Sequence, residues 1–92
     1  MRILSWNVAG LRAMLKKKNL QELLTKYDYD IVCLQETKAE ESQVELPPEI
    51  IEKYPFRFWN STLGTTQRKG LSGTTIWSKT SPINRIKHPS ID

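Results

Sequence analysis

Cysteine, histidine and long apolar segments are all scarce in this sequence of 92 residues. Its one cysteine, Cys33, cannot form an internal disulfide, and its position within an apolar run predicts an unreactive core thiol, as in proteins of reducing compartments. No apolar segment approaches the roughly 18 residues of a membrane-spanning helix, and the polar start of the chain does not resemble a secretory signal. We therefore expect neither a disulfide-stabilised fold nor a membrane protein.

The composition is typical of a globular protein with a mildly basic surface. Hydrophobic residues make up 38% of the chain and charged residues 26%, and the net charge is +4. Such a charge is compatible with a polyanionic partner, although a solvated basic surface is its commoner cause. Two interpretations also apply to the basic triplet Lys16, Lys17 and Lys18. These residues either bind phosphates of a partner or form a solvated face of a helix.

Two apolar segments that each end in polar residues define the predicted sheet. The near-continuous apolar run over residues 31–34 predicts a strand over 31–36 that is buried on both faces. Residues 2–8 predict a first strand, in which Asn7 directly follows the apolar residues. If a helix connects them, the strands are parallel neighbours, so Asn7 and Glu36 reach the edge where open α/β sheets bind ligands.

Helical spacing predicts that the connecting segment is broken into two parts. We expect a short helical turn after Gly10, a break near Asn19 and a helix to about Tyr27, with Asn19 and Glu22 as a capping box. Residues 39–45 are predicted to form an acidic surface loop, and two prolines introduce a helix over 48–54. The apolar stripe expected to face the sheet consists of Leu11, Leu15, Leu20, Leu23, Leu24 and Tyr27.

Two further strands are predicted in the second half of the chain. Alternating side chains indicate a strand over 56–61, and β-branched and aromatic residues indicate another over 74–77. The short connection between them, with an exposed segment over 63–70, favours an antiparallel hairpin. Trp59 and Trp77 are expected in the core, and Ile83 and Ile86 could begin a further strand.

The predicted helices are too few to cover both faces of such a sheet. A short sheet with an uncovered face and open edges is marginally stable or prone to associate. We therefore expect residues 1–92 to be one partial domain, the amino-terminal part of a larger protein.

Glu36 is the strongest candidate for a functional residue. A carboxylate at a strand end is a suitable ligand for Mg²⁺, which takes one or two carboxylates together with waters and substrate phosphate oxygens. The amide of Asn7 can bind a phosphate oxygen or orient a neighbouring carboxylate. The alternative is that Glu36 is simply solvated and that Asn7 serves the turn that follows it.

Three motifs resemble the exonuclease III-type AP endonucleases of the endonuclease/exonuclease/phosphatase superfamily, in the family's order and at similar spacing. They are Ser5-Trp6-Asn7-Val8-Ala9-Gly10-Leu11-Arg12-Ala13, Leu34-Gln35-Glu36-Thr37-Lys38 and Gly70-Leu71-Ser72-Gly73. The resemblance implies an α/β fold, the amino-terminal part of a four-layer sandwich in which helices cover a mixed sheet. It also implies Mg²⁺-dependent cleavage of double-stranded DNA on the 5′ side of abasic sites, with Mn²⁺ as an alternative ion.

The resemblance also implies roles for individual residues. Glu36 corresponds to a metal ligand and Asn7 to an active-site asparagine beside it. Arg12 and Lys38 correspond to residues near DNA or the carboxylates, and the Gly70–Gly73 turn to one that approaches the DNA backbone. Arg68 and Lys69 directly precede this turn, where flexible cations can meet a DNA backbone, so they are also DNA-binding candidates.

This sequence departs from the family's pattern at several positions. Ala9 stands where the family commonly has Asp or Asn, so a second metal position is in doubt, and Leu71 stands where many members have an aromatic residue. The family's later catalytic groups are not found in the chain, and the context of its one histidine, His88, differs from their Ser-Asp-His motif. Without a general base, we expect half an active site, inactive alone and completed by a missing carboxy-terminal half.

Two rival interpretations stay open. One is another phosphoesterase of the superfamily, a phosphatase or an RNA deadenylase, because one fold can serve several substrates. The other is a catalytically inactive product of a truncated or split gene. Exonuclease or 3′-phosphodiesterase activity could accompany the endonuclease reaction, and we expect an intracellular protein of the nucleus or cytoplasm, or of the nucleoid in a bacterium.

Overall fold

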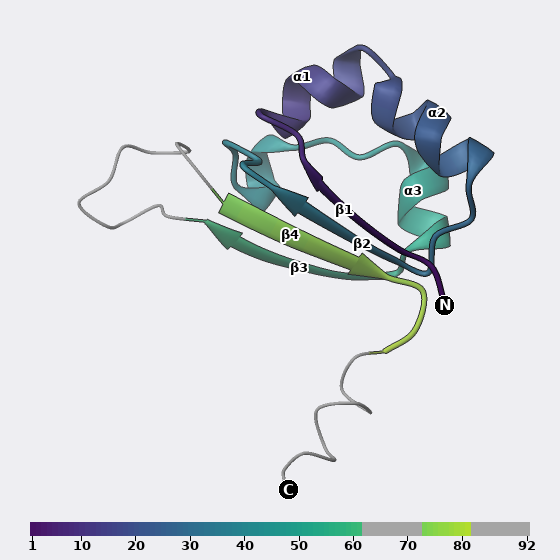
Figure 1. The fold of residues 1–92 in the computed structure, drawn as a ribbon. Coiled ribbons are helices and arrows are strands. Elements are labelled where there is room, and N and C mark those ends of the chain that lie inside the picture. The colour runs from purple at the N-terminus through teal and green to yellow at the C-terminus, as the bar shows by residue number, and fades with distance from the viewer. Residues whose placement is uncertain (62–72, 82–92) are drawn as a thin grey trace, which may run out of the picture.

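The computed structural model describes residues 1–61 and 73–81, which form a four-stranded mixed sheet covered by helices (Figure 1). The strands are β1 (Ile3–Asn7), β2 (Ile31–Gln35), β3 (Phe56–Ser61) and β4 (Gly73–Ser78), in the order β1-β2-β4-β3. β1 and β2 are parallel, and β4 is antiparallel to both of its neighbours. The α/β class, the parallel pair and the antiparallel pairing of β3 with β4 are thus confirmed.

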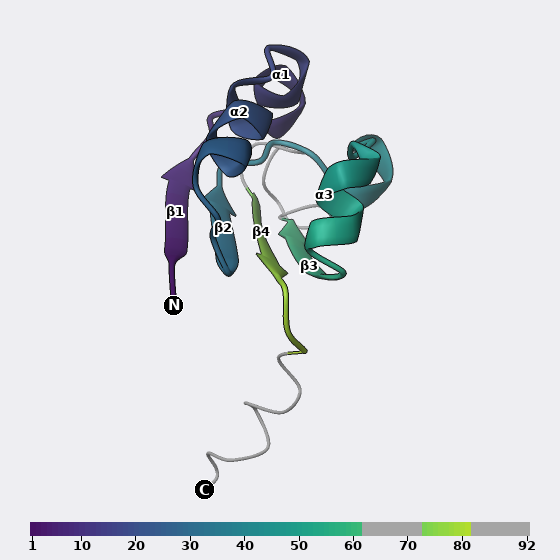
Figure 2. The same cartoon turned by 90° about the vertical axis from the view of Figure 1, so that its right-hand side faces the viewer.

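The helices all lie on one face of this sheet. They are α1 (Leu11–Lys16), α2 (Asn19–Lys26), the 3₁₀ turn η1 (Glu41–Gln43) and α3 (Pro48–Lys53). Figure 2 shows α1 and α2 over β1 and β2, α3 near β3, and the opposite face without a covering element among the described residues. Pro48 occupies the first turn of α3, where its missing N–H costs no hydrogen bond. No helix of the described part is long and apolar enough to span a membrane.

The predicted capping box at α2 is wrong. Asn19 is the first residue of α2, and the capping position belongs to Lys18, which has a φ of 65° and makes no side-chain capping bond. The Lys18 N–H donates to the carbonyl of Leu15, which closes α1, and the left-handed backbone then redirects the chain into α2. A capping box forms instead at η1, between Glu40 and Gln43.

The core lies between the helices and the covered face of the sheet. Trp77 and Tyr54 are its largest fully buried side chains, and Trp59 packs against it, as predicted for both tryptophans. The apolar stripe is largely confirmed, but Tyr27 is 38% exposed because it follows the last turn of α2. The buried cluster consists of Val8, Leu11, Leu20, Leu24, Val32, Leu34, Ile50, Tyr54 and Trp77.

The other face of the sheet, here called the open face, carries the alternate residues of each strand. Its side chains form cross-strand rows, since Cys33 pairs with Ile76, and Ile76 pairs with Phe58. Ile3, Phe58 and Ile76 are 57%, 48% and 45% exposed. Within the described residues, the expectation that β2 is buried on both faces is therefore wrong, and Cys33 is half-buried on the open face. Within residues 1–61 and 73–81, helices cover one face of the sheet only, as the sequence predicted.

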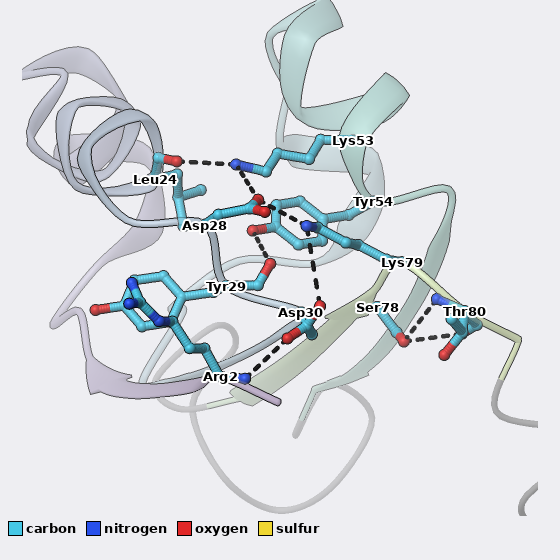
Figure 3. A network of polar contacts seen from close by, with 10 residues as sticks. All are labelled: Arg2, Leu24, Asp28, Tyr29, Asp30, Lys53, Tyr54, Ser78, Lys79 and Thr80. Atoms are coloured by element: carbon cyan, nitrogen blue, oxygen red, sulfur yellow. Dashed lines mark hydrogen bonds and ion pairs between the residues drawn. The ribbon is translucent and has the colours of Figure 1, made fainter.

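Charged side chains tie the elements together at the edge of the sheet where β1 and β2 begin (Figure 3). The Nζ atoms of Lys53 and Lys79 lie 3.1 and 2.6 Å from Oδ1 of Asp28, and Lys53 Nζ also donates to the carbonyl of Leu24. These contacts connect α2, α3 and the end of β4, and we call them the far-edge network. Hydrogen bonds from Lys79 and Lys53 hold the pKa of Asp28 below its ordinary value of 3.8.

Tyr54 joins this edge to the core. Its hydroxyl donates a hydrogen bond of 2.8 Å to the carbonyl of Tyr29, while its ring stacks at a tilt against Trp77. Burial, followed by the negative charges of Asp28 and Asp30, raises the pKa of Tyr54 to about 12. The folded state therefore favours the neutral phenol.

We predict that Tyr54→Phe lowers stability by about 1 kcal/mol, or about 4–8 °C in Tm, at neutral pH because one part-buried hydrogen bond is lost. Since the folded pKa is raised from 10.0 to about 12, the contribution of Tyr54 is complete below pH 10 and is lost as the pH rises toward 12. Thermal unfolding followed by circular dichroism should show the difference from the wild type narrowing over that range. A difference in Tm that stays constant over this pH range would contradict this account. The matched control is Tyr29→Phe, because the Tyr29 hydroxyl makes no hydrogen bond within the described residues.

Candidate active site

Asn7 and Glu36 meet at the edge of the sheet where β1 and β2 end. Asn7 Nδ2 donates a hydrogen bond of 2.9 Å to Oε2 of Glu36. Asn7 Oδ1 in turn accepts a hydrogen bond of 3.1 Å from the N–H of Ala9, which fixes the orientation of the amide. Glu36 is exposed, and its Oε1 has no hydrogen-bond partner among the described residues. The structure thus brings together the two residues that the sequence proposed as catalytic.

Backbone pairing continues past the ends of the two strands. The N–H groups of Val8, Gly10 and Leu11 donate to the carbonyls of Gln35, Glu36 and Thr37 at 3.0, 2.8 and 2.9 Å. We call residues 36–39 the site loop. This continuation attaches the loop to the start of α1.

The backbone around the pair is strained at three non-glycine residues. Ala9, Glu36 and Lys38 have φ angles of 49°, 53° and 55°, in the left-handed region that L-residues avoid. Each such residue costs about 1–2 kcal/mol and persists only where its surroundings hold it. Two of the three belong to the site loop.

Arg12 and Lys38, both predicted to contact DNA, also lie together. Arg12 Nη2 donates a hydrogen bond of 3.3 Å to the carbonyl of Lys38. The Lys38 side chain passes close to Gly10, since a Cβ placed on that glycine would lie 4.0 Å from Lys38 Cδ. Both residues are exposed, and the hydrogen bond attaches Arg12 to the loop that carries Glu36.

Gly73 is the one member of the predicted glycine turn that the described residues include. It is buried at the start of β4, has a φ of 141°, and its carbonyl accepts a hydrogen bond of 3.2 Å from the N–H of Thr37. This places Gly73 beside the site loop. The other candidates around this turn lie outside the described residues: Arg68, Lys69, Gly70, Leu71 and Ser72.

Thr37 is a residue that the sequence-based reasoning missed. It is only 1% exposed, and its hydroxyl donates to the carbonyl of Ala39 at 3.3 Å. Its backbone carbonyl and N–H bind Leu11 and Gly73, so it joins α1, the site loop and β4. The available signal was a β-branched residue between two charged ones, which is a weak indication of burial.

The donor set at this edge fits an ion that keeps most of its water ligands. Within residues 1–61 and 73–81 no cluster of three or more His, Cys, Asp or Glu side chains could hold a metal. A single carboxylate with one free oxygen suits Mg²⁺, which binds through one or two carboxylates plus waters and phosphates, and does not suit a closed protein cage. The Asn7 amide is engaged on both sides, because its Oδ1 accepts from the Ala9 N–H and its Nδ2 donates to Glu36.

A mixed α/β sheet with polar side chains at the carboxyl ends of its parallel strands has the geometry of a ligand-binding α/β domain. Comparison with known proteins identifies the family to which this domain belongs. Residues 4–92 match the family described as "Endonuclease/Exonuclease/phosphatase family". The chain belongs to this family.

Individual relatives and solved structures agree with this assignment. The chain is 43% identical over 86 residues to an exodeoxyribonuclease of Bacillus subtilis, with 94% of this chain and 31% of the relative covered. It is 44% identical over 86 residues to the DNA repair nuclease APEX1 of Danio rerio, with 91% and 26% covered. The catalytic domain of Xenopus laevis APE2 superimposes with a TM-score of 0.62 at 38% identity, over 88% of this chain and 24% of that one.

These matches cover only part of each relative. The chain spans about a quarter to a third of the length of the proteins it resembles. An AP endonuclease from Archaeoglobus fulgidus gives the same result, with a TM-score of 0.62 at 26% identity over 88% of this chain and 28% of that one.

We predict that Ala9→Gly stabilises the protein by about 0.5–1 kcal/mol, because glycine adopts the φ of 49° without the steric cost of a Cβ. Ala13→Gly is the matched control, since Ala13 lies inside α1 and should lose about 1 kcal/mol. Urea unfolding of both variants measures the difference. A destabilised Ala9→Gly variant would show that Ala9 is not strained.

Proposed function

We propose that this chain forms the metal-binding part of a DNA repair nuclease that hydrolyses the phosphodiester bond on the 5′ side of abasic sites in double-stranded DNA. The observation that carries the proposal is the 2.9 Å hydrogen bond from Asn7 to Glu36, which leaves one carboxylate oxygen free at the strand-end edge. The relatives named as DNA repair nucleases supply the substrate class. Exonuclease or 3′-phosphodiesterase activity would use the same bond chemistry.

Each residue of the site has a distinct task in this proposal. Glu36 supplies a hard oxygen ligand for Mg²⁺, or for Mn²⁺ in its place, and Asn7 keeps the carboxylate aimed at the edge. The bound ion would stabilise negative charge on the scissile phosphate. Arg12 and Lys38 are exposed and meet at the site loop, where cationic side chains can bind neighbouring phosphates of the DNA backbone.

We further propose that a carboxy-terminal polypeptide segment completes this site by packing on the open face. Among the described residues no group of three or more His, Cys, Asp or Glu side chains gathers at this edge, so we expect the general base of the reaction to come from another segment. The apolar side chains on the open face give such a segment its docking surface, since Ile3, Phe58 and Ile76 are each about half exposed. The short coverage of each relative is consistent with a partner of this kind.

A chimera tests the proposed function. In it, this chain replaces the matching part of the Bacillus subtilis exodeoxyribonuclease, to which it is 43% identical over 86 residues. We expect incision of a duplex oligonucleotide at one abasic-site analogue only when Mg²⁺ or Mn²⁺ is present. Glu36→Gln should lower the rate at least about 100-fold, because it removes the charged ligand.

The control for this experiment is Glu41→Gln, which neutralises an exposed carboxylate in η1 and should leave the rate unchanged. Full activity of the Glu36→Gln chimera would remove Glu36 from the site. A folded chimera that cleaves inositol phosphates or poly(A) but not the abasic duplex would assign the chain to another branch of the family.

The open face gives a separate prediction in the same chimera. Ile76→Lys should abolish incision, because a charge placed on this face would be buried without a partner once the second segment docks. Ile51→Lys is the matched control, since Ile51 on α3 is 43% exposed and Ile76 is 45% exposed. Equal incision by both variants would mean that nothing packs on the open face at Ile76.

A further inference from the structure

Three successive carbonyl groups of the site loop accept hydrogen bonds from three successive residues at the start of α1. The first two donors are backbone N–H groups, and the third is a side chain. The bonds run from Gly10 N to Glu36 O at 2.8 Å, from Leu11 N to Thr37 O at 2.9 Å, and from Arg12 Nη2 to Lys38 O at 3.3 Å.

The third bond holds a strained part of the loop. Lys38 has a φ of 55°, a conformation that a side-chain-bearing residue leaves unless contacts keep it there. Within the described residues, the guanidinium of Arg12 is the hydrogen-bond donor that engages the Lys38 carbonyl. Arg12 therefore supports the strained Lys38 of the site loop.

The same loop determines where the carboxylate of Glu36 points. Glu36 itself is left-handed, with a φ of 53°, and the Gln35 carbonyl before it is fixed by Val8 N at 3.0 Å. Gly10 N holds the carbonyl of Glu36 itself, and Arg12 holds the carbonyl of Lys38 two residues further on, so Arg12 supports the loop on the downstream side of Glu36. Misplacing a metal ligand by a fraction of an ångström weakens binding.

We propose that Arg12 is a positioning residue for Glu36, acting through the Lys38 carbonyl and independently of DNA. This inference rests on the proposed metal-binding role of Glu36. It assigns to Arg12 a function in the free protein that a contact with a DNA phosphate would not require.

Electrostatics and positioning predict opposite effects of removing Arg12. Loss of a cation close to a divalent-metal site should strengthen metal binding, because a repulsion is removed. Loss of the anchor should weaken it. Lys38→Met provides the charge-matched comparison, since it removes a cation from the same loop but keeps the backbone carbonyl that Arg12 binds.

The experiment measures Mn²⁺ binding to the chain by electron paramagnetic resonance in the absence of DNA, with Glu36→Gln defining the signal of this site. We expect Arg12→Met to bind Mn²⁺ about tenfold more weakly than the wild type, in the range found when supports of metal ligands are removed. Lys38→Met should bind equally or more tightly. Circular dichroism at the assay temperature establishes that all variants are folded.

The outcomes separate the inference from the proposal on which it rests. If Arg12→Met binds Mn²⁺ as tightly as Lys38→Met, Arg12 does not position Glu36, and the inference is overturned while the metal site stands. If the wild type binds no more Mn²⁺ than Glu36→Gln, the proposed metal role of Glu36 fails, and the positioning role fails with it.

A second measurement separates loop positioning from general destabilisation. In NMR spectra, Arg12→Met should shift the amide signals of residues 36–39 while leaving those of the far-edge network, around Asp28 and Lys53, in place. Shifts spread evenly over both edges would indicate a global effect and would contradict a local anchor.

Discussion

Parallel pairing of β1 with β2 is the constraint on which the site depends. The register Asn7 with Gln35 brings the ends of two strands, 28 residues apart in sequence, to one edge. The pairing then extends through Gly10 and Leu11 into the site loop, so that one ladder positions the strands, the loop and the start of α1. The contact between Asn7 and Glu36 is a consequence of that ladder.

Those parts of the structure that follow from hydrophobic pattern could be predicted from the sequence. The apolar runs predicted the two parallel strands, and the polar residues that follow them identified Asn7 and Glu36. The carboxyl ends of parallel strands lie together at the side of an α/β sheet where ligands bind. The cap of α2 could not be predicted, since Lys18 takes that position through its backbone conformation and not through a capping side chain. Thr37 was missed for a similar reason, because its burial comes from tertiary bonds to Leu11 and Gly73.

The two ends of the parallel strands are held by different forces: the site edge lies where β1 and β2 end, and the far-edge network lies where they begin. The site edge relies on backbone hydrogen bonds, which salt affects little, whereas the far-edge network relies on exposed ion pairs around Asp28, which salt screens.

The prediction that the strands are buried was right for the covered face of the sheet and wrong for the open face. The periodicity of apolar residues does not show which face of a strand is covered by another element. Both faces of β2 look apolar in sequence, yet only Val32 and Leu34 are fully buried.

The position of β4 has a consequence for biosynthesis. This strand leaves the ribosome last of the four, yet it occupies the interior of the sheet between β2 and β3. Until Gly73–Ser78 has been translated, β3 has no strand to pair with, and the nascent chain exposes an unpaired edge. The bond from Thr37 to Gly73 also forms only then, so the loop that carries Glu36 is completed in the same late step that closes the sheet.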